Sequence, residues 1–301
     1  MPYSSFANLL EDARTEQRSL AECIQSRESV ESDISEDEVR ARLAETLQVM
    51  RSAIEQGSKP DIKSRTGLTG GDAALLLESV HTTGSINVVG AHFTEVLAAS
   101  LATVELNAAM GRIVAAPTAG ASGVLPGVFF SIAAEHNLDE DALIDGLLVA
   151  GAIGACFAAK ATLSGAAGGC QAEVGTAAAM TAAGVTYMLG QNKTGGTEST
   201  NQAVGHAASF AMQGQLGLVC DPVAGLVEIP CIVRNVTGAA VALAGAQMAL
   251  SGMQFAIPLD EVVDTASRVG AAIPPALRET ARGGLATTPT GKRIAKDLSG
   301  C

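Results

Sequence analysis

The sequence predicts an all-α protein, and its composition gives three reasons for this. Hydrophobic residues make up 48% of the 301 residues, yet aromatic residues make up only 3% and there is no Trp. Long stretches are rich in Ala, and 33 Gly are spread among them. Ala is the best helix former, whereas β-sheets favour branched and aromatic side chains. We therefore predict a single large helical domain whose core is packed from small side chains.

Charged residues are densest in the first part of the chain, which predicts a helical N-terminal extension over residues 1–65 and a core domain over residues 66–301. Ser35 and Glu38 match a capping box at the start of a helix. Apolar residues then recur at helical spacing until Gly57 and Pro60, which end the helix. In the core, helices are predicted over 94–110, 139–161, 173–189, 237–255 and 259–269. The polar stretch 191–202 is expected to be an exposed loop.

Charge and hydropathy narrow the possible partners. The net charge of −12 comes without a basic cluster, so no nucleic acid partner is expected. The N-terminus has no basic start followed by an apolar run, which predicts an unexported, cytoplasmic protein. Segment 236–258 has no charged residue and is long enough to cross a bilayer, but it is rich in Ala, Gly, Ser and Gln. We therefore predict a buried helix there and no membrane partner.

Two cysteines bracket the run CDPVAGLVEIPC. Helical geometry cannot continue through Pro222 and Pro230, so Cys220 and Cys231 are expected on an irregular loop where they can converge. Cys170 closes the run AKATLSGAAGGC, whose glycines let the backbone approach a bulky inorganic group. No CxxC pair occurs among these thiols, so spacing alone leaves a metal site and buried hydrophobic cysteines equally open.

The remaining cysteines have separate interpretations. Cys23 and Cys156 fall inside helical patterns and are expected to be small hydrophobic core residues. Cys301 is the last residue of the sequence and could fold back as a further ligand. In a reducing compartment, metal or redox roles are favoured over a disulfide framework.

A second segment, NAAMGRIVAAPTAGASGVLPG at 107–127, supplies candidate substrate contacts. Its small-residue loop leaves backbone N–H groups free for a carboxylate or another small anion, although an ordinary tight turn fits equally well. Asn107, Thr118 and Ser122 are our candidate catalytic residues in this segment. Lys160, which interrupts an apolar helix, is a fourth candidate, with a solvent-reaching lysine as the alternative. Arg112 and Arg234 could bind a carboxylate or form structural ion pairs.

Three runs, RIVAAPTAGASGVLPG, GAAGGCQAEVG and CDPVAGLVEIPCIVRN, resemble the α chain of bacterial iron–sulfur-dependent L-serine dehydratases. The resemblance covers roughly residues 65–300. It implies a [4Fe–4S] cluster held by Cys170, Cys220 and Cys231, with one iron open to L-serine. It also implies that Cys301 occupies the open iron until serine displaces it. The implied reaction is β-elimination of water from L-serine, which yields pyruvate and ammonia for amino-acid degradation and gluconeogenesis.

The proton-abstracting base is not identified by the matched runs. His81, His92, His136 and His206 all lie outside them. The resemblance implies a separate β subunit, forming a heterodimer or larger oligomer, because single-chain relatives carry an additional N-terminal domain with a Ser-Ser-His motif that is absent here. Two alternatives remain open at this point: a cysteine desulfidase of the same fold, and a noncatalytic helical subunit with a structural metal.

Overall fold

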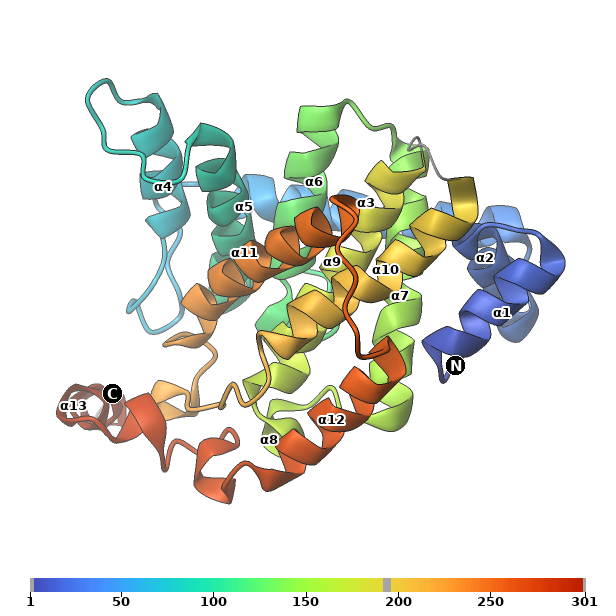
Figure 1. The fold of residues 1–301 in the computed structure, drawn as a ribbon. Coiled ribbons are helices and arrows are strands. Elements are labelled where there is room, and N and C mark those ends of the chain that lie inside the picture. Colours follow the sequence, from blue (N-terminus) through green and yellow to red (C-terminus); the bar gives the residue numbers. More distant parts are fainter. Residues whose placement is uncertain (1–2, 192–195, 300–301) are drawn as a thin grey trace.

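Every regular element in the computed structural model is a helix, as predicted for an all-α protein (Figure 1). The structure describes residues 3–191 and 196–299. Within these ranges the only β-type pairing is an isolated bridge between Cys220 and Arg278. The helices are α1 (Phe6–Glu16), α2 (Leu20–Ser32), α3 (Glu36–Gly57), α4 (Asp72–His81), α5 (Ala91–Ala108), α6 (Val124–His136), α7 (Glu140–Lys160), α8 (Gly165–Gly168), α9 (Thr176–Gly190), α10 (Gly196–Gln213), α11 (Cys231–Leu250), α12 (Leu259–Ala272) and α13 (Pro289–Ser299).

Helix α9 lies at the centre of the fold. All of its residues except Leu189 are buried, and it packs against α6, α7, α10 and α11. Small side chains make this packing close: a Cβ atom at Gly184 would lie only 2.7 Å from the carbonyl oxygen of Gly146 in α7. The core of small residues predicted from composition therefore places helix backbones nearly in contact.

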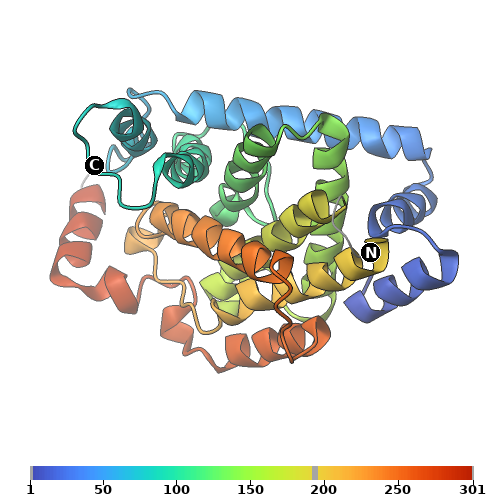
Figure 2. The same ribbon diagram turned by 45° about the horizontal axis from the view of Figure 1, so that its top comes forward.

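The other helices surround this centre. Figure 2 shows α3 as a long helix along one side of the molecule, where it packs on α5, α6 and α7. Helix α4 packs on α5, and α12 packs on α7, α8 and α10. Helices α1–α3 cover most of the first 65 residues, while the division of the chain at residue 65 stays a prediction.

Two of the sequence-based boundaries are wrong by six or more residues, and the others differ by five or fewer. Helix α10 begins at Gly196, inside the stretch 191–202 that was expected to be a loop; residues 192–195 lie outside the described residues. The polar residues 197–199 form the exposed first turn of an amphipathic helix. Helix α11 begins at Cys231, six residues earlier than predicted, because Pro230 stands at its N-cap position and leaves the helix free to start. Cys231 therefore lies in a helical first turn rather than on an irregular loop.

Helix α7 is the one helix in the described ranges that is long and apolar enough to cross a membrane. Two thirds of its most apolar window (67%) is buried inside the protein, against α2, α3, α9 and α12. Core helices of globular proteins have the same length and composition. The arrangement fits a core helix, and segment 236–258 lies mainly in α11, which packs on α5, α6, α9 and α10.

Glu105 of α5 caps the N-terminus of α4. Its carboxylate, only 1% exposed, accepts hydrogen bonds from the backbone N–H groups of Gly71 (3.2 Å), Asp72 (2.9 Å) and Ala73 (3.2 Å). Glu105→Ala should lower the free energy of unfolding by about 2–4 kcal/mol in urea denaturation, because three buried donors lose their acceptor. The matched control is Glu78→Ala on the exposed face of α4, expected within about 0.5 kcal/mol of the wild type. Equal stability of the two variants would contradict this capping role.

Asp260, in the first turn of α12, holds α1 in place. Its carboxylate accepts hydrogen bonds from Ser5 Oγ (3.1 Å), the N–H groups of Phe6 (3.2 Å) and Ala7 (3.0 Å), and Lys160 Nζ (3.1 Å). Burial alone raises the pKa of Asp260, but the hydrogen bonds from Ala7 and Lys160 bring it below the ordinary value of 3.8. Because the folded pKa is lowered, this stabilisation is complete above the ordinary pKa and is lost as the pH falls through the folded one.

We therefore expect the amides of α1 to lose hydrogen-exchange protection as the pH falls below about 4. The variant Asp260→Asn should show faster exchange in α1 already at pH 7. Asp264→Asn, one turn later and exposed, is the control and should exchange like the wild type. If α1 stays fully protected in Asp260→Asn, another contact holds this helix.

Candidate functional site

Three buried thiols lie on the segments that follow α8 and lead into α11. Cys170 precedes the π-helical turn η2 (Gln171–Gly175), Cys220 precedes the short 3-10 turn η3 (Val223–Gly225), and Cys231 begins α11. Their exposed fractions are 4%, 3% and 8%, and all three are free thiols. Burial is the main cause that raises the pKa of Cys220, followed by the negative charges of Cys170 and Cys231. The three side chains are therefore near enough to one another to interact electrostatically, and we call them the thiol site.

The backbone around Cys220 is fixed by a segment far along the chain. Cys220 donates its N–H to the carbonyl of Leu277 (2.8 Å) and accepts from the N–H of Glu279 (2.7 Å). Arg278 donates from Nη1 to the carbonyl of Ala167 (3.2 Å), in the short helix α8 just before Cys170. Segment 277–279 therefore connects the loop of Cys220 to α8.

Arg234 places a positive charge beside the thiols. Its guanidinium donates to Asp221 Oδ1 (2.7 Å) and to the carbonyl of Val219 (2.8 Å). Burial raises the pKa of Cys170 to about 11 and that of Cys231 to about 12, while the Arg234 charge acts to lower both. Of the two roles considered for Arg234, the structure shows the ion pair, and it adds an electrostatic contact with the thiol site.

Asn235 joins the second predicted segment to the thiol site. Its Oδ1 accepts from the N–H of Gly123 (3.0 Å), and its Nδ2 donates to the carbonyls of Gly120 (2.7 Å) and Cys231 (3.0 Å). The side chain is fully buried. Loop 118–123 is therefore tied to the first turn of α11. Sequence reasoning missed this residue, although it ends the run CDPVAGLVEIPCIVRN.

The candidate residues of the second segment occupy different environments. Asn107 donates from Nδ2 to the carbonyl of Ala119 (3.2 Å), which holds the loop. Thr118 donates from Oγ1 to Glu173 Oε1 (2.8 Å). Ser122 is fully buried, and its hydroxyl has no hydrogen-bond partner in the described part of the chain. A buried unpaired hydroxyl is a group free to bind a ligand. Catalytic roles for these three residues stay predictions.

Glu173 is a site residue that sequence reasoning missed. It lies in η2, and burial raises its pKa although the hydrogen bond from Thr118 acts to lower it. A Cβ atom at Gly165 would lie 2.5 Å from Glu173 Oε2 and 3.2 Å from Cys220 Sγ, so the carboxylate and this thiol face the same point. The available signal was a lone charged residue within the small and apolar run GAAGGCQAEVG.

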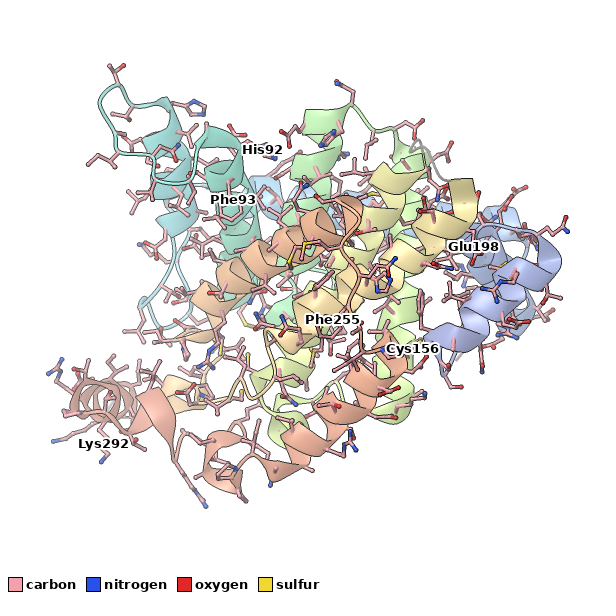
Figure 3. The ribbon with its side chains drawn as sticks, viewed as in Figure 1. His92, Phe93, Cys156, Glu198, Phe255 and Lys292 are labelled. Carbon is pink, nitrogen blue, oxygen red and sulfur yellow. The ribbon has the colours of Figure 1, made fainter. Side chains whose placement is uncertain are left out.

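Lys160 lies in the ion pair with Asp260 described above, with 31% of its side chain exposed. This ion pair was not among the roles considered for Lys160 from the sequence, and a catalytic role for Lys160 stays a prediction. Two histidines are also engaged elsewhere: His92 Nε2 lies 2.7 Å from Glu135 Oε2 near the start of α5 (Figure 3), and His206 Nδ1 accepts from the N–H of Phe255 (3.2 Å). His81 and His136 are exposed at the ends of α4 and α6.

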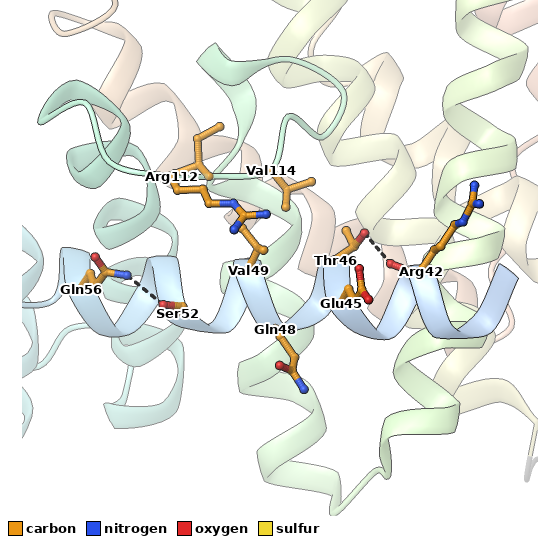
Figure 4. A pocket seen from close by; sticks show the side chains of 10 residues that line it. Arg42, Glu45, Thr46, Gln48, Val49, Ser52, Gln56, Arg112 and Val114 are labelled. Carbon is orange, nitrogen blue, oxygen red and sulfur yellow. Dashed lines mark hydrogen bonds between the residues drawn. The ribbon is translucent and has the colours of Figure 1, made fainter. Parts of the chain in front are cut away.

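A cavity of about 770 Å³ lies between α3 and the loop after α5 (Figure 4). Arg112 and Val114 line one wall, and α3 lines the other. Arg112 therefore faces this cavity rather than the thiol site. The lining residues are Arg42, Glu45, Thr46, Gln48, Val49, Ser52, Gln56, Arg112, Ile113 and Val114.

The fold and the site together define an all-helical protein with three converging buried thiols beside a guanidinium and a carboxylate. Residues 9–286 match the family model described as serine dehydratase alpha chain. The chain belongs to this family, which confirms the resemblance found in the sequence.

Relatives with known names agree with this assignment. The chain is 39% identical to a probable L-serine dehydratase alpha chain of Bacillus subtilis (strain 168), over 99% of this chain and 96% of the relative. It is 39% identical to the L-serine dehydratase alpha chain of Peptoniphilus asaccharolyticus, over 89% and 88%. It is 37% identical to the L-serine dehydratase of Streptomyces coelicolor, over 83% of this chain but only 54% of that longer protein.

Proposed function

We propose that this chain is the α subunit of an L-serine dehydratase, a lyase that converts L-serine to pyruvate and ammonia by β-elimination of water. The convergence of Cys170, Cys220 and Cys231 in a buried site is the observation that carries the proposal. Membership of the serine dehydratase alpha-chain family supports it. The proposed enzyme acts in the cytoplasm, in amino-acid degradation, and the pyruvate that it forms can enter gluconeogenesis.

The thiol site fits a [4Fe–4S] cluster with one iron left open. In residues 3–191 and 196–299, no three His, Cys, Asp or Glu side chains are arranged to hold a single metal ion. A cluster binds each thiolate through a different iron, so its ligands need not meet at one ion. The thiols are free, buried and electrostatically coupled, which suits such ligands. When bound, the cluster supplies a Lewis acid for the substrate hydroxyl.

The chain's own residues hold and orient the substrate. Asn107 and Asn235 fix loop 118–123, whose Ser122 hydroxyl is free to hydrogen-bond a bound molecule. Arg234 offsets the negative charge of the ligating thiolates, held in place by Asp221. Because the thiols are nearly inaccessible to solvent, bulk water is excluded from their surroundings.

A separate β subunit completes the proposed enzyme and supplies the base that takes the α-proton. The alpha-chain names of the relatives and the longer Streptomyces protein support a two-chain enzyme. His92 lies against Glu135, and His206 accepts a hydrogen bond from the N–H of Phe255, so both histidines have contacts elsewhere. The complex is a heterodimer or a larger oligomer and needs neither nucleic acid nor membrane.

Cys301 lies outside the described residues, so its role as a further ligand and internal inhibitor stays a prediction. Helix α13, the last element before it, packs against η3 in the loop between Cys220 and Cys231. The C-terminal helix is therefore close to the thiol site, which supports this prediction.

The test is pyruvate formation from L-serine by anaerobically reconstituted protein, alone and with a coexpressed β chain. We expect activity with L-serine in the two-chain preparation. Sulfide release from L-cysteine without pyruvate formation from L-serine would instead establish a desulfidase. A cluster-loaded complex that converts neither amino acid would support the alternative of a noncatalytic subunit with a structural metal.

A further inference from the structure

Glu173 carries a partly buried carboxylate close to the thiol of Cys220. Thr118 donates a hydrogen bond to Oε1 (2.8 Å), whereas Oε2 receives none from the described residues. An ionised carboxylate that is partly withdrawn from water is stabilised by a hydrogen-bond donor or a cation. The free oxygen therefore marks a place where a bound molecule can complete the contacts.

Two glycines let the backbone approach this carboxylate closely. A Cβ atom at Gly165 would lie 2.5 Å from Oε2 and 3.2 Å from Cys220 Sγ, and one at Gly120 would lie 3.3 Å from Oε1. Any larger residue at Gly165 would collide with the carboxylate and crowd the thiol. A molecule bound at Glu173 consequently lies near Cys220, one of the three proposed cluster ligands.

The charge around Glu173 calls for a cation. The carboxylate of Glu279 acts to raise the pKa of Glu173, and the charge of Glu173 acts to raise those of Cys170 and Cys231. Arg234, the cation that acts on these thiols, is already paired with Asp221 at 2.7 Å. A positively charged group that enters with the ligand would offset this excess of negative charge.

We propose that Glu173 binds the α-ammonium group of the amino-acid substrate. This rests on the proposed function and extends it to specificity. The contact places the ammonium beside Cys220 and selects α-amino acids over hydroxy acids of the same size, which lack the positive charge. Thr118 is a positioning residue that orients the carboxylate from its other oxygen.

The test compares Glu173→Gln with the wild type as the two-chain holoenzyme, with iron contents matched. The KM for L-serine should rise about 10- to 100-fold, as expected for a lost charge-assisted hydrogen bond, with a smaller change in kcat. The dissociation constant of L-serine, titrated through the cluster absorption, should rise by the same factor. Inhibition by 3-hydroxypropanoate, which is serine without its amino group, should be unchanged or stronger.

Two further variants keep the test decisive. Glu173→Asp is used if Glu173→Gln is poorly folded. It retains the negative charge, so it should bind L-serine more tightly than Glu173→Gln does. Glu105→Gln changes a buried carboxylate at the α4 cap and should leave the KM unchanged while lowering stability.

Three results would overturn the inference: an unchanged serine affinity, equal weakening of serine and 3-hydroxypropanoate, or a loss of kcat at constant KM, which would indicate proton transfer. A wild-type holoenzyme without serine activity would instead refute the proposed function.

Discussion

Cys220→Ala should lose both its iron and its ability to form pyruvate from L-serine after anaerobic reconstitution. The variant leaves Cys170 and Cys231 as the remaining thiols of the site, and two thiolates cannot hold a cluster that needs three protein ligands with one iron open. The variant Cys220→Ser should also lose iron and activity, because a hydroxyl group at neutral pH does not replace a thiolate as an iron ligand. Iron content, sulfide content and pyruvate formation are the three measurements.

Cys156→Ala is the matched control for this experiment. Cys156 is also a buried free thiol, but it lies in α7 within the main hydrophobic core. Its replacement should cost about 1 kcal/mol of stability through lost packing and leave iron and activity intact. Retention of iron and activity in Cys220→Ala, or their loss in Cys156→Ala alone, would contradict the assignment of the thiol site.

Asn235→Leu should give the second large effect. The change removes the side-chain partner of three backbone groups, at Gly120, Gly123 and Cys231, and two of these hydrogen bonds are buried. At about 1–3 kcal/mol for each unpaired group, partly relieved by relaxation, the free energy of unfolding should fall by about 3–5 kcal/mol. Because Asn235 also ties loop 118–123 to the turn of Cys231, iron retention and kcat should fall as well. Urea denaturation and iron analysis measure the two consequences separately.

Thr237→Val, two residues further along α11, is the control for Asn235→Leu. Thr237 is exposed, so its replacement should change the free energy of unfolding by less than about 0.5 kcal/mol and leave the iron content unchanged. If Asn235→Leu behaved like this control, the three hydrogen bonds would have no role in holding the site.

The fold class could be predicted because the amino-acid composition alone indicates an all-α protein. A core poor in aromatic residues and rich in Ala has few alternatives to closely packed helices. The boundaries failed where local chemistry was ambiguous. Residues 197–199 are polar both in a loop and in the exposed first turn of α10, and only the packing of that helix on α9 and α11 distinguishes the two. Pro230 ends one helix as readily as it precedes another.

The site was predictable in part. Prolines and glycines around Cys170, Cys220 and Cys231 indicated irregular backbone. This is right near Cys170 and Cys220 but not at Cys231, and the three thiols lie near enough to interact electrostatically. Glu173 and Asn235 could not be identified because their partners, Thr118 and Gly123, are 55 and 112 positions away in the sequence. No local spacing encodes such contacts. Lys160 was a candidate site residue because it is a charged residue in an apolar helix. Its ion-pair partner Asp260 is 100 positions away and could not be predicted from the sequence.

Cys170, Cys220 and Cys231 are proposed to hold an iron–sulfur cluster with one iron open to L-serine. Mössbauer spectroscopy of anaerobically reconstituted, iron-57-labelled two-chain enzyme tests this proposal most directly, with and without L-serine. We expect iron and sulfide in the ratio of a [4Fe–4S] cluster and a change in the signal of a single iron site when serine is added. A different iron centre, or a cluster whose spectrum is unaffected by saturating serine, would contradict it.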